Sequence, residues 1–169
     1  MTQSDIESAD TPTRLSNGGQ FPALEFAKVG GGTISLPSDL SGGYGVVLFY
    51  RGAWCPYCNA QLAAFQRAHD SLGAAGIAVV AISVDDESAA AALVSKRRLG
   101  FAVGYGADAD QVAAATGAYV NADPKYLQST GFVLAPDGTV VTAVYSSGAI
   151  GRLVPDDVIG LVRYIQSPG

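Results

Sequence analysis

The chain has 169 residues, which is enough for one domain with a full hydrophobic core and too few for two domains of ordinary size. Its apolar fraction of 49% and its formal net charge of −5 exclude a disordered chain and argue against a nucleic-acid binder. No segment reaches transmembrane length, and residues 1–13 lack the basic start and apolar middle of a secretory signal. We therefore expect no membrane or nucleic-acid partner and a cytoplasmic location.

The first residues differ in composition from the rest of the chain. Residues 1–18 are polar, small and rich in turn formers, which predicts a flexible leader before a single domain at 19–169. Residues 24–26 and 33–36 alternate apolar and polar on either side of three glycines. This pattern predicts a β-hairpin with one face exposed to solvent.

Two continuous apolar runs, 46–50 and 77–84, have the pattern of strands buried on both faces. Between them, apolar residues recur every three or four positions from Pro56 to about Gly73, which predicts one amphipathic helix. Strand, helix and strand in this order predict a right-handed crossover with parallel strands. The sequence therefore predicts an α/β fold.

The second half of the chain predicts alternating short elements. A helix is expected at 88–99, ending in the basic triplet 96–98, which is either a solvated last turn or a contact patch for an acidic partner. A strand at 101–105 and a helix at 108–116 follow. The turn at 136–139 then joins two strands of an antiparallel hairpin.

The last element is predicted to be a helix that begins near Pro155. Along it, four apolar residues form one stripe that should cover a face of the sheet. These are Val158, Leu161, Val162 and Ile165.

Both cysteines of the chain, Cys55 and Cys58, stand where the first buried strand runs into a helix. A Cys-x-x-Cys pair at a helix start is typical of a redox pair, because the free N–H groups and the helix dipole favour the thiolate. Half of a zinc site is the alternative, but one chain with no other cysteine and one histidine cannot supply four soft ligands. We therefore expect no metal and no cofactor. A further alternative is that the two cysteines are an incidental buried pair with no redox role. Trp54 before the motif and Pro56 and Tyr57 inside it argue against this alternative.

The order of elements is that of the thioredoxin fold, with a mixed central sheet, flanking helices and an N-terminal hairpin extension. From about Gly19 to Ile165 the sequence resembles the alkyl hydroperoxide reductase/thiol-specific antioxidant group, the peroxiredoxin-like branch of the thioredoxin superfamily. The resemblance is carried by four segments of the chain. They are residues 21–26 (FPALEF), 48–52 (LFYRG), 54–58 (WCPYC), and 132–134 (FVL) with the Asp137-Gly138 turn.

The resemblance to peroxiredoxins is incomplete at the site. On their Pro-x-x-x-Thr-x-x-Cys loop, Cys58 falls on the peroxide-reacting cysteine, Cys55 on the threonine and Arg51 on the proline. The arginine that these enzymes carry before the later core strand is missing, since residues 128–131 read QSTG. The resemblance implies that the replaced threonine and the missing arginine together make peroxide reduction detectable but slow, with disulfide exchange at least comparable. On the thioredoxin and glutaredoxin pattern, by contrast, Cys55 attacks and Cys58 resolves, so the sequence leaves the attacking sulfur open.

Several neighbours are candidates for supporting the thiols. Arg51 is either a cation that favours the thiolate or an exposed charge at the strand end. Ser129 or Thr130 can donate a hydrogen bond but no charge, and Trp54 and Tyr57 either shape a substrate rim or, for Trp54, pack in the core. His69 lies eleven residues beyond Cys58, about 16 Å along a helix, which is too far for a general base.

Two classes of function follow from these residues. The first is a thiol peroxidase or thiol-disulfide oxidoreductase that acts on a small peroxide or a protein disulfide. Its reductant would be an external thiol of the thioredoxin, glutaredoxin or low-molecular-weight kind, and a homodimer is an assembly that the resemblance allows. The second is a redox sensor or interaction protein, whose disulfide switches an interface without turnover.

Overall fold

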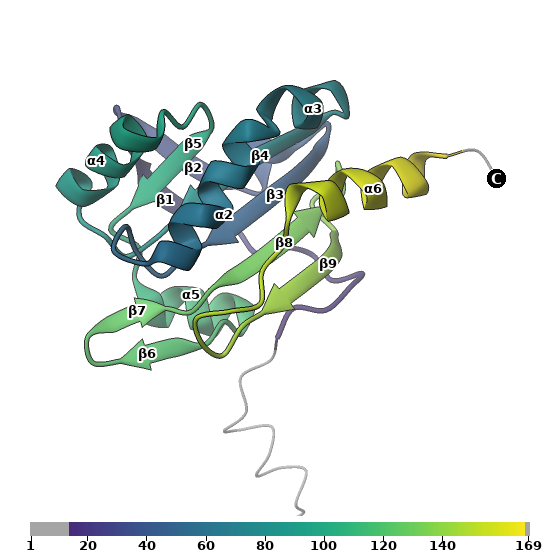
Figure 1. Cartoon of the computed structure of the whole chain (residues 1–169). Helices are drawn as coiled ribbons and strands as arrows, with labels where there is room; N and C mark the ends of the chain where they lie inside the picture. Colours follow the sequence, from purple (N-terminus) through teal and green to yellow (C-terminus); the bar gives the residue numbers. More distant parts are fainter. Residues whose placement is uncertain (1–13, 168–169) are drawn as a thin grey trace, which may run out of the picture.

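The central sheet of the computed structural model, which describes residues 14–167, has seven strands in the order β2-β1-β5-β4-β3-β8-β9 (Figure 1). β4 is parallel to β3 and β5, and the other neighbouring strands are antiparallel. The elements in chain order are β1 (Leu24–Lys28), β2 (Thr33–Leu36), η1 (Ser38–Leu40), β3 (Tyr44–Phe49), α2 (Pro56–Arg67), α3 (His69–Ala74), β4 (Ile77–Ile82), α4 (Glu87–Arg97), β5 (Ala102–Tyr105), α5 (Ala109–Thr116), β6 (Val120–Ala122), β7 (Lys125–Leu127), β8 (Thr130–Leu134), β9 (Val140–Tyr145) and α6 (Pro155–Gln166).

The predicted crossover is confirmed at the centre of this sheet. β3 and β4 pair in parallel, with Val46 opposite Val79 and Leu48 opposite Ala81. α2 and α3 connect them. Side chains of β3 alternate between two core clusters, so both faces of the strand are buried, as its continuous apolar sequence requires. The strand ends at Phe49 and delivers the cysteines to the edge of the core.

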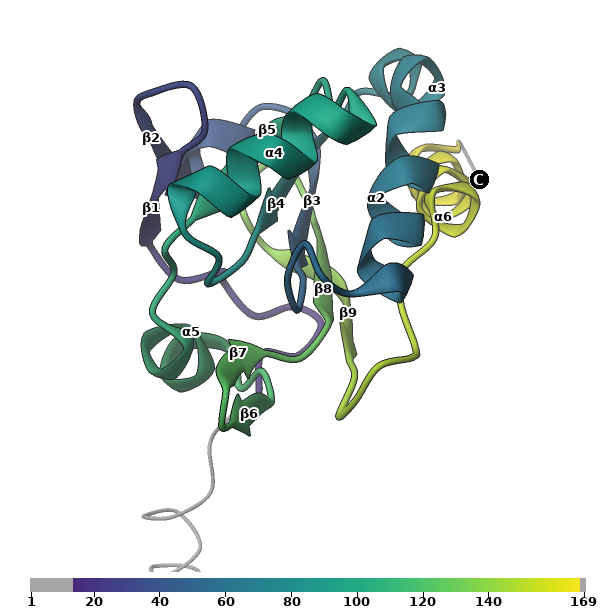
Figure 2. The same ribbon diagram turned by 60° about the vertical axis from the view of Figure 1, so that its left-hand side comes forward.

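Two layers of side chains cover the sheet. α2, α4 and α6 pack on one face through residues such as Leu62, Leu93 and Val162. The other face is covered by α5 and by apolar residues of the N-terminal segment, such as Val112 and Phe21. Figure 2 shows α2 and α4 on the same side of the strands. The arrangement is the mixed α/β fold expected from the sequence.

The N-terminal hairpin also forms as predicted. β1 and β2 pair antiparallel and bury alternate residues, and β1 pairs with β5, so that the hairpin extends the central sheet. Most of the predicted leader, residues 1–13, lies outside the described residues. Its last part is attached to the domain, because the backbone N–H groups of Leu15 and Gly18 donate to the carbonyls of Thr116 and Val140.

The helix predicted from Pro56 to Gly73 is wrong in one respect, because the chain forms two helices that meet at Ala68. Ala68 has φ −90° and ψ 7°, outside the helical range, although it is a good helix former. His69 therefore begins α3 rather than continuing the helix of the cysteines, and it is exposed. The break leaves His69 without a part in the site.

The apolar stripe predicted for the closing helix is also only partly correct. α6 begins at Pro155 and buries Val158 and Val162 as expected, but it buries Ile159 instead of Ile165. Ile165 is 42% exposed. Within residues 14–167, no helix combines the length and the apolar character needed to cross a membrane.

Candidate active site

The two cysteines lie at the first turn of α2 and approach each other to 3.1 Å. Cys55 is the N-cap, and its sulfur accepts the backbone N–H of Cys58 at 3.4 Å. Pro56 occupies the first helical position, where its missing N–H costs nothing. Both thiols are free and fully buried. The spacing of the motif therefore places two thiols within bonding reach without unfolding the helix.

Hydrogen bonds fix the loop that precedes the pair. The N–H of Ala53 donates to the Asp85 carboxylate at 2.8 Å, and the Asn59 side chain donates to the Ala53 carbonyl at 2.9 Å. A Cβ on Gly52 would collide with the indole nitrogen of Trp54 and lie 3.1 Å from the Asp85 carboxylate. A side chain at position 52 would therefore displace the Trp54 ring and crowd the carboxylate that holds the loop.

Arg51 is a cation at the site rather than an exposed charge at the strand end. Its Nη1 lies 3.7 Å from the Cys55 sulfur, and its backbone N–H donates to the Cys58 sulfur at 3.3 Å. The guanidinium is held by Gln128 Oε1 at 3.0 Å and by the Tyr126 hydroxyl at 2.8 Å. Four contacts thus fix Arg51 against the thiols, and two of them come from residues that the sequence did not indicate.

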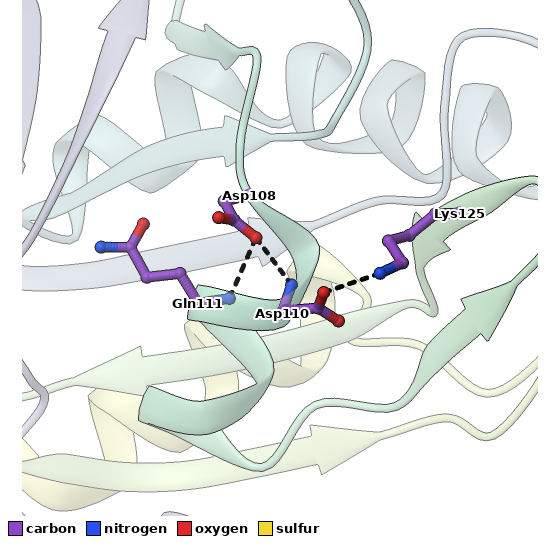
Figure 3. A network of polar contacts seen from close by, with 4 residues as sticks. All are labelled: Asp108, Asp110, Gln111 and Lys125. Atoms are coloured by element: carbon purple, nitrogen blue, oxygen red, sulfur yellow. Dashed lines mark hydrogen bonds and ion pairs between the residues drawn. The ribbon is translucent and has the colours of Figure 1, made fainter.

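Tyr126 belongs to a two-stranded hairpin, β6–β7, that the sequence analysis missed. The hairpin is tied to α5 by an exposed ion pair of 2.6 Å between Lys125 and Asp110 (Figure 3). α5 itself begins at the N-cap Asp108, whose carboxylate accepts the N–H groups of Asp110 and Gln111. The ion pair thus joins β7 to α5 at the surface, and β7 leads directly to Gln128.

Arg152 is the second cation at the thiols, and the sequence analysis missed it entirely. Its Nη2 lies 3.1 Å from the Cys58 sulfur and 3.8 Å from the Cys55 sulfur. Its Nη1 donates to the Ala149 carbonyl, and the buried Gln61 side chain on α2 donates to the Leu153 carbonyl at 3.0 Å. The segment between β9 and α6 therefore supplies a charge that residues before β8 do not. The position before β8 carries no arginine, as the sequence indicates, but a guanidinium reaches the thiols from another segment, which weakens the argument for slow peroxide reduction.

These charges act differently on the two thiols. Burial opposes ionisation of Cys55, but hydrogen bonds from Cys58 and the cations of Arg51 and Arg152 hold its pKa below the ordinary value. Burial raises the pKa of Cys58, as does its hydrogen bond to Cys55, against the opposing effect of the Arg51 N–H and the Arg152 guanidinium. These opposite shifts favour a thiolate at Cys55 and a thiol at Cys58.

The aromatic residues of the motif form an exposed rim. Trp54 is 56% exposed and Tyr57 is 53% exposed, so neither is core packing. Trp54 packs edge-on against Tyr126 with ring centroids 4.9 Å apart, and the Arg51 guanidinium lies 5.0 Å from its ring centroid. The Arg152 guanidinium lies 5.9 Å from the Tyr57 ring. Each cation is thus flanked by one aromatic ring of the motif.

The polar residues before β8 do not reach the sulfurs. The Thr130 hydroxyl donates to the Gln128 carbonyl at 3.0 Å, and the Ser129 carbonyl accepts the Ser146 N–H at 2.9 Å. Both residues are buried and brace the backbone around Gln128. Within residues 14–167, no three His, Cys, Asp or Glu side chains gather as a metal site would require.

Several known proteins are similar to this chain in sequence and in architecture. Residues 17–143 match the model of the AhpC/TSA family. A Mycobacterium tuberculosis protein provisionally named a peroxiredoxin is 33% identical over 150 residues, which cover 83% of this chain and 92% of that protein. A peroxiredoxin of Thermotoga petrophila is 24% identical over 155 residues, which cover 89% of this chain and 71% of that protein.

Solved structures agree on the fold. Peroxidoxin BcpB of Mycobacterium tuberculosis matches with a TM-score of 0.79 at 23% identity, covering 91% of this chain and 100% of that one. Mycobacterium tuberculosis AhpC matches with a TM-score of 0.76 at 23% identity, covering 92% and 95% of the two chains. Because the family model matches most of this chain, the chain belongs to the AhpC/TSA family, as a peroxiredoxin-like protein of the thioredoxin superfamily.

Proposed function

We propose that the protein is a thiol peroxidase in which Cys55 and Cys58 form one disulfide in each catalytic cycle. Membership of the AhpC/TSA family supports thiol-dependent peroxide reduction. The observation that carries the role of the pair is the 3.1 Å approach of two buried thiols beneath two guanidinium groups. Preorganised cations of this kind stabilise both a thiolate and the oxygen that leaves the peroxide.

The first step is attack by the Cys55 thiolate on the nearer oxygen of a hydroperoxide, ROOH. An S–O bond forms and the O–O bond breaks, so that sulfur is oxidised to a sulfenic acid while the alcohol ROH leaves with one added proton. Arg51 and Arg152 lie where they can stabilise the departing oxygen as well as the attacking sulfur. We assign the attack to Cys55, because the Arg51 guanidinium and the Cys58 N–H contact its sulfur and hold its pKa below the ordinary value.

The second step closes the disulfide. The Cys58 thiol attacks the sulfenic sulfur, an S–S bond forms, the S–O bond breaks and water leaves. Because the two cysteines share one helical turn, this step needs little movement of the backbone. An external thiol then supplies the two electrons that return both sulfurs to the reduced state.

One observation favours the opposite order of attack. Arg152 lies closer to the Cys58 sulfur, at 3.1 Å, than to the Cys55 sulfur, at 3.8 Å. Attack by Cys58 would follow the peroxiredoxin loop pattern, and Cys55 would then resolve. Both orders yield the same disulfide, so variants of the single cysteines are needed to separate them.

The test compares Cys55→Ser, Cys58→Ser and the wild type for peroxide consumption and for trapping of a sulfenic acid. If Cys55 attacks, Cys58→Ser reacts once with hydrogen peroxide and retains a sulfenic acid, whereas Cys55→Ser does not react. The reverse result assigns the attack to Cys58. A wild type that forms no intramolecular disulfide, or that is oxidised once and is never turned over by an added thiol, refutes the peroxidase and favours the sensor.

The proposed partners of the protein are a disulfide-containing protein and a second copy of the same chain. The thiols serve equally for exchange with a protein disulfide, so reduction of such a disulfide should be assayed beside peroxide. A homodimer is also proposed, and sedimentation of the reduced and oxidised protein tests it.

A further inference from the structure

A groove of about 340 Å³ lies between the cysteine loop and α4. Its walls come from the residues just before Cys55, from the first turn of α2 and from one face of α4, which lies on the same side of the sheet as α2 (Figure 2). Residues lining it include Trp54, Asn59, Ala89, Leu93, Lys96 and Arg97. The groove starts at the redox loop and follows α4 away from it.

The far end of the groove is positive. Lys96 and Arg97 are both exposed, and neither forms an ion pair with any residue of the 14–167 segment. They are two adjacent cations on a chain with a net charge of −5. The C-terminal end of the α4 dipole, about half a negative charge, opposes an anion there, but two full positive charges outweigh it. Two residues of the basic triplet noted in the sequence are therefore available to carboxylates.

The near end of the groove offers a hydrogen-bond acceptor beside the redox pair. Asn59 uses its amide nitrogen to bind the Ala53 carbonyl, and its buried Oδ1 has no partner among the described residues. Trp54, which directly precedes Cys55, lines the same end. From Ala89 to Lys96, α4 rises by about 11 Å at ~1.5 Å per residue. An extended tripeptide spans roughly 10 Å, so one such molecule reaches from end to end.

We infer that this groove binds a small acidic thiol peptide, with carboxylates at Lys96 and Arg97, a peptide N–H at Asn59 and the thiol toward Cys55. The inference rests on the proposed function, because the ligand acts as the reductant. The peptide thiolate attacks the Cys55 sulfur of the disulfide, forming a mixed disulfide and releasing the Cys58 thiolate, which takes up a proton. A second peptide thiolate attacks the peptide sulfur, so that a peptide disulfide leaves and Cys55 is reduced.

The experiment measures steady-state hydrogen peroxide reduction with glutathione as the acidic thiol and with dithiothreitol as an uncharged one. The variant is Lys96→Glu with Arg97→Glu, and the matched control is Arg67→Glu with Arg163→Glu, which makes the same charge change at exposed positions outside the groove. We expect the KM for glutathione to rise at least tenfold in the groove variant and to stay within about twofold in the control. The kinetics with dithiothreitol should stay within about twofold in both.

A binding measurement makes the result independent of turnover. S-methylglutathione, which cannot exchange, should bind the wild type by calorimetry and lose at least tenfold in affinity in the groove variant, with circular dichroism showing that both variants fold. Equal effects in the groove and control variants overturn the inference. Equal effects of the groove substitutions on the kinetics with glutathione and with dithiothreitol also overturn it. Turnover with an acidic dithiol protein but not with glutathione also overturns it, in favour of protein docking. Failure of the wild type with every thiol would instead refute the proposed function.

Discussion

Arg152 donates to the sulfur of Cys58 at 3.1 Å although 94 residues separate them in the chain. The contact joins the segment after the last strand of the sheet to the first turn of α2. Because Arg152 also lies 3.8 Å from the Cys55 sulfur, its charge acts on the whole redox pair. The acidity of the thiols therefore depends on a residue outside the motif.

Replacement of this cation should weaken both the thiolate and the peroxidase. In Arg152→Gln we expect the pKa of the Cys55 thiol to rise toward its ordinary value. Peroxide reduction at neutral pH should fall by roughly 10²-fold, as for loss of one preorganised donor. Ultraviolet thiolate absorbance against pH measures the first, and peroxide consumption the second. The control is Arg163→Gln, an exposed arginine on α6. An unchanged thiol titration in Arg152→Gln would show that this guanidinium does not stabilise the thiolate.

The hairpin β6–β7 should influence the thiols through Arg51. Tyr126→Phe removes the hydroxyl that Arg51 binds at 2.8 Å but keeps the ring that packs against Trp54. Loss of one such hydrogen bond costs about 1 kcal/mol, so we expect a drop in peroxide reduction of about three- to tenfold. Stopped-flow measurement of the first oxidation reports it directly.

A matched control lies one residue away. Lys125→Ala removes only the exposed ion pair with Asp110, which contributes little to stability because solvent screens it. We expect an unchanged rate of oxidation. If Lys125→Ala and Tyr126→Phe slow the reaction equally, the hairpin acts by its overall position rather than through the Tyr126 hydroxyl.

Alkaline pH should destabilise the protein through Tyr50, the residue between β3 and the cysteine loop. Burial raises the pKa of Tyr50 to about 12. The unfolded state, with a pKa near 10, loses this proton first, so stability is complete below about pH 10 and falls as pH rises to about 12. The loss is on the order of 3 kcal/mol. Urea unfolding between pH 9 and 12 should show a flatter decline in Tyr50→Phe, and identical slopes would contradict the prediction.

The packing of Gly131 in β8 should control where Arg152 lies. A Cβ at this position would be 2.7 Å from Cδ1 of Leu153, the buried neighbour of Arg152. Gly131→Ala should therefore displace that segment, lower the free energy of unfolding by about 1–3 kcal/mol and raise the thiol pKa. Calorimetry and thiolate absorbance measure the two effects.

Gly160 on α6 gives the opposite case. No atom lies within 4 Å of a Cβ added there, and the residue is in a helix interior. Gly160→Ala should raise the free energy of unfolding by about 0.5–1 kcal/mol and leave the thiols unchanged. For Gly131→Ala, a thiol titration identical to that of the wild type would contradict the prediction, because it would show that the packing of Leu153 does not control the position of Arg152.

The sequence predicts those elements of the molecule that are determined by residues close together in the chain. The buried strand at 46–50 is expected from its apolar run, and it is found as Tyr44–Phe49. The position of Cys55 and Cys58 at a helix start follows from the same run and from Pro56. The helix break at Ala68, by contrast, has no marker, because alanine carries no signal for a kink and the apolar period continues through it.

Two features of the site depend on contacts between distant residues. The strands of β6–β7 have three residues each, too few for a hydrophobic period to appear. Arg152 stands in a glycine-containing loop, where an arginine is ordinarily an exposed charge. Its place at the thiols becomes visible only when β9 and α6 are packed on the sheet. The role of a glycine or of a pair of neighbouring thiols can be predicted from the local sequence. The residue that supplies a positive charge to the thiols cannot, because it is distant in the chain.

The late position of Arg152 has a consequence for the protein during its synthesis. A ribosome extends the chain from the N-terminus, so both cysteines emerge well before the arginine that faces them. Until β9 and α6 have packed, the nascent chain presents thiols without this cation, and thiols of higher pKa react more slowly with peroxide. We therefore expect full reactivity to arise only when the last element of the fold has packed, which would protect the growing polypeptide from premature oxidation.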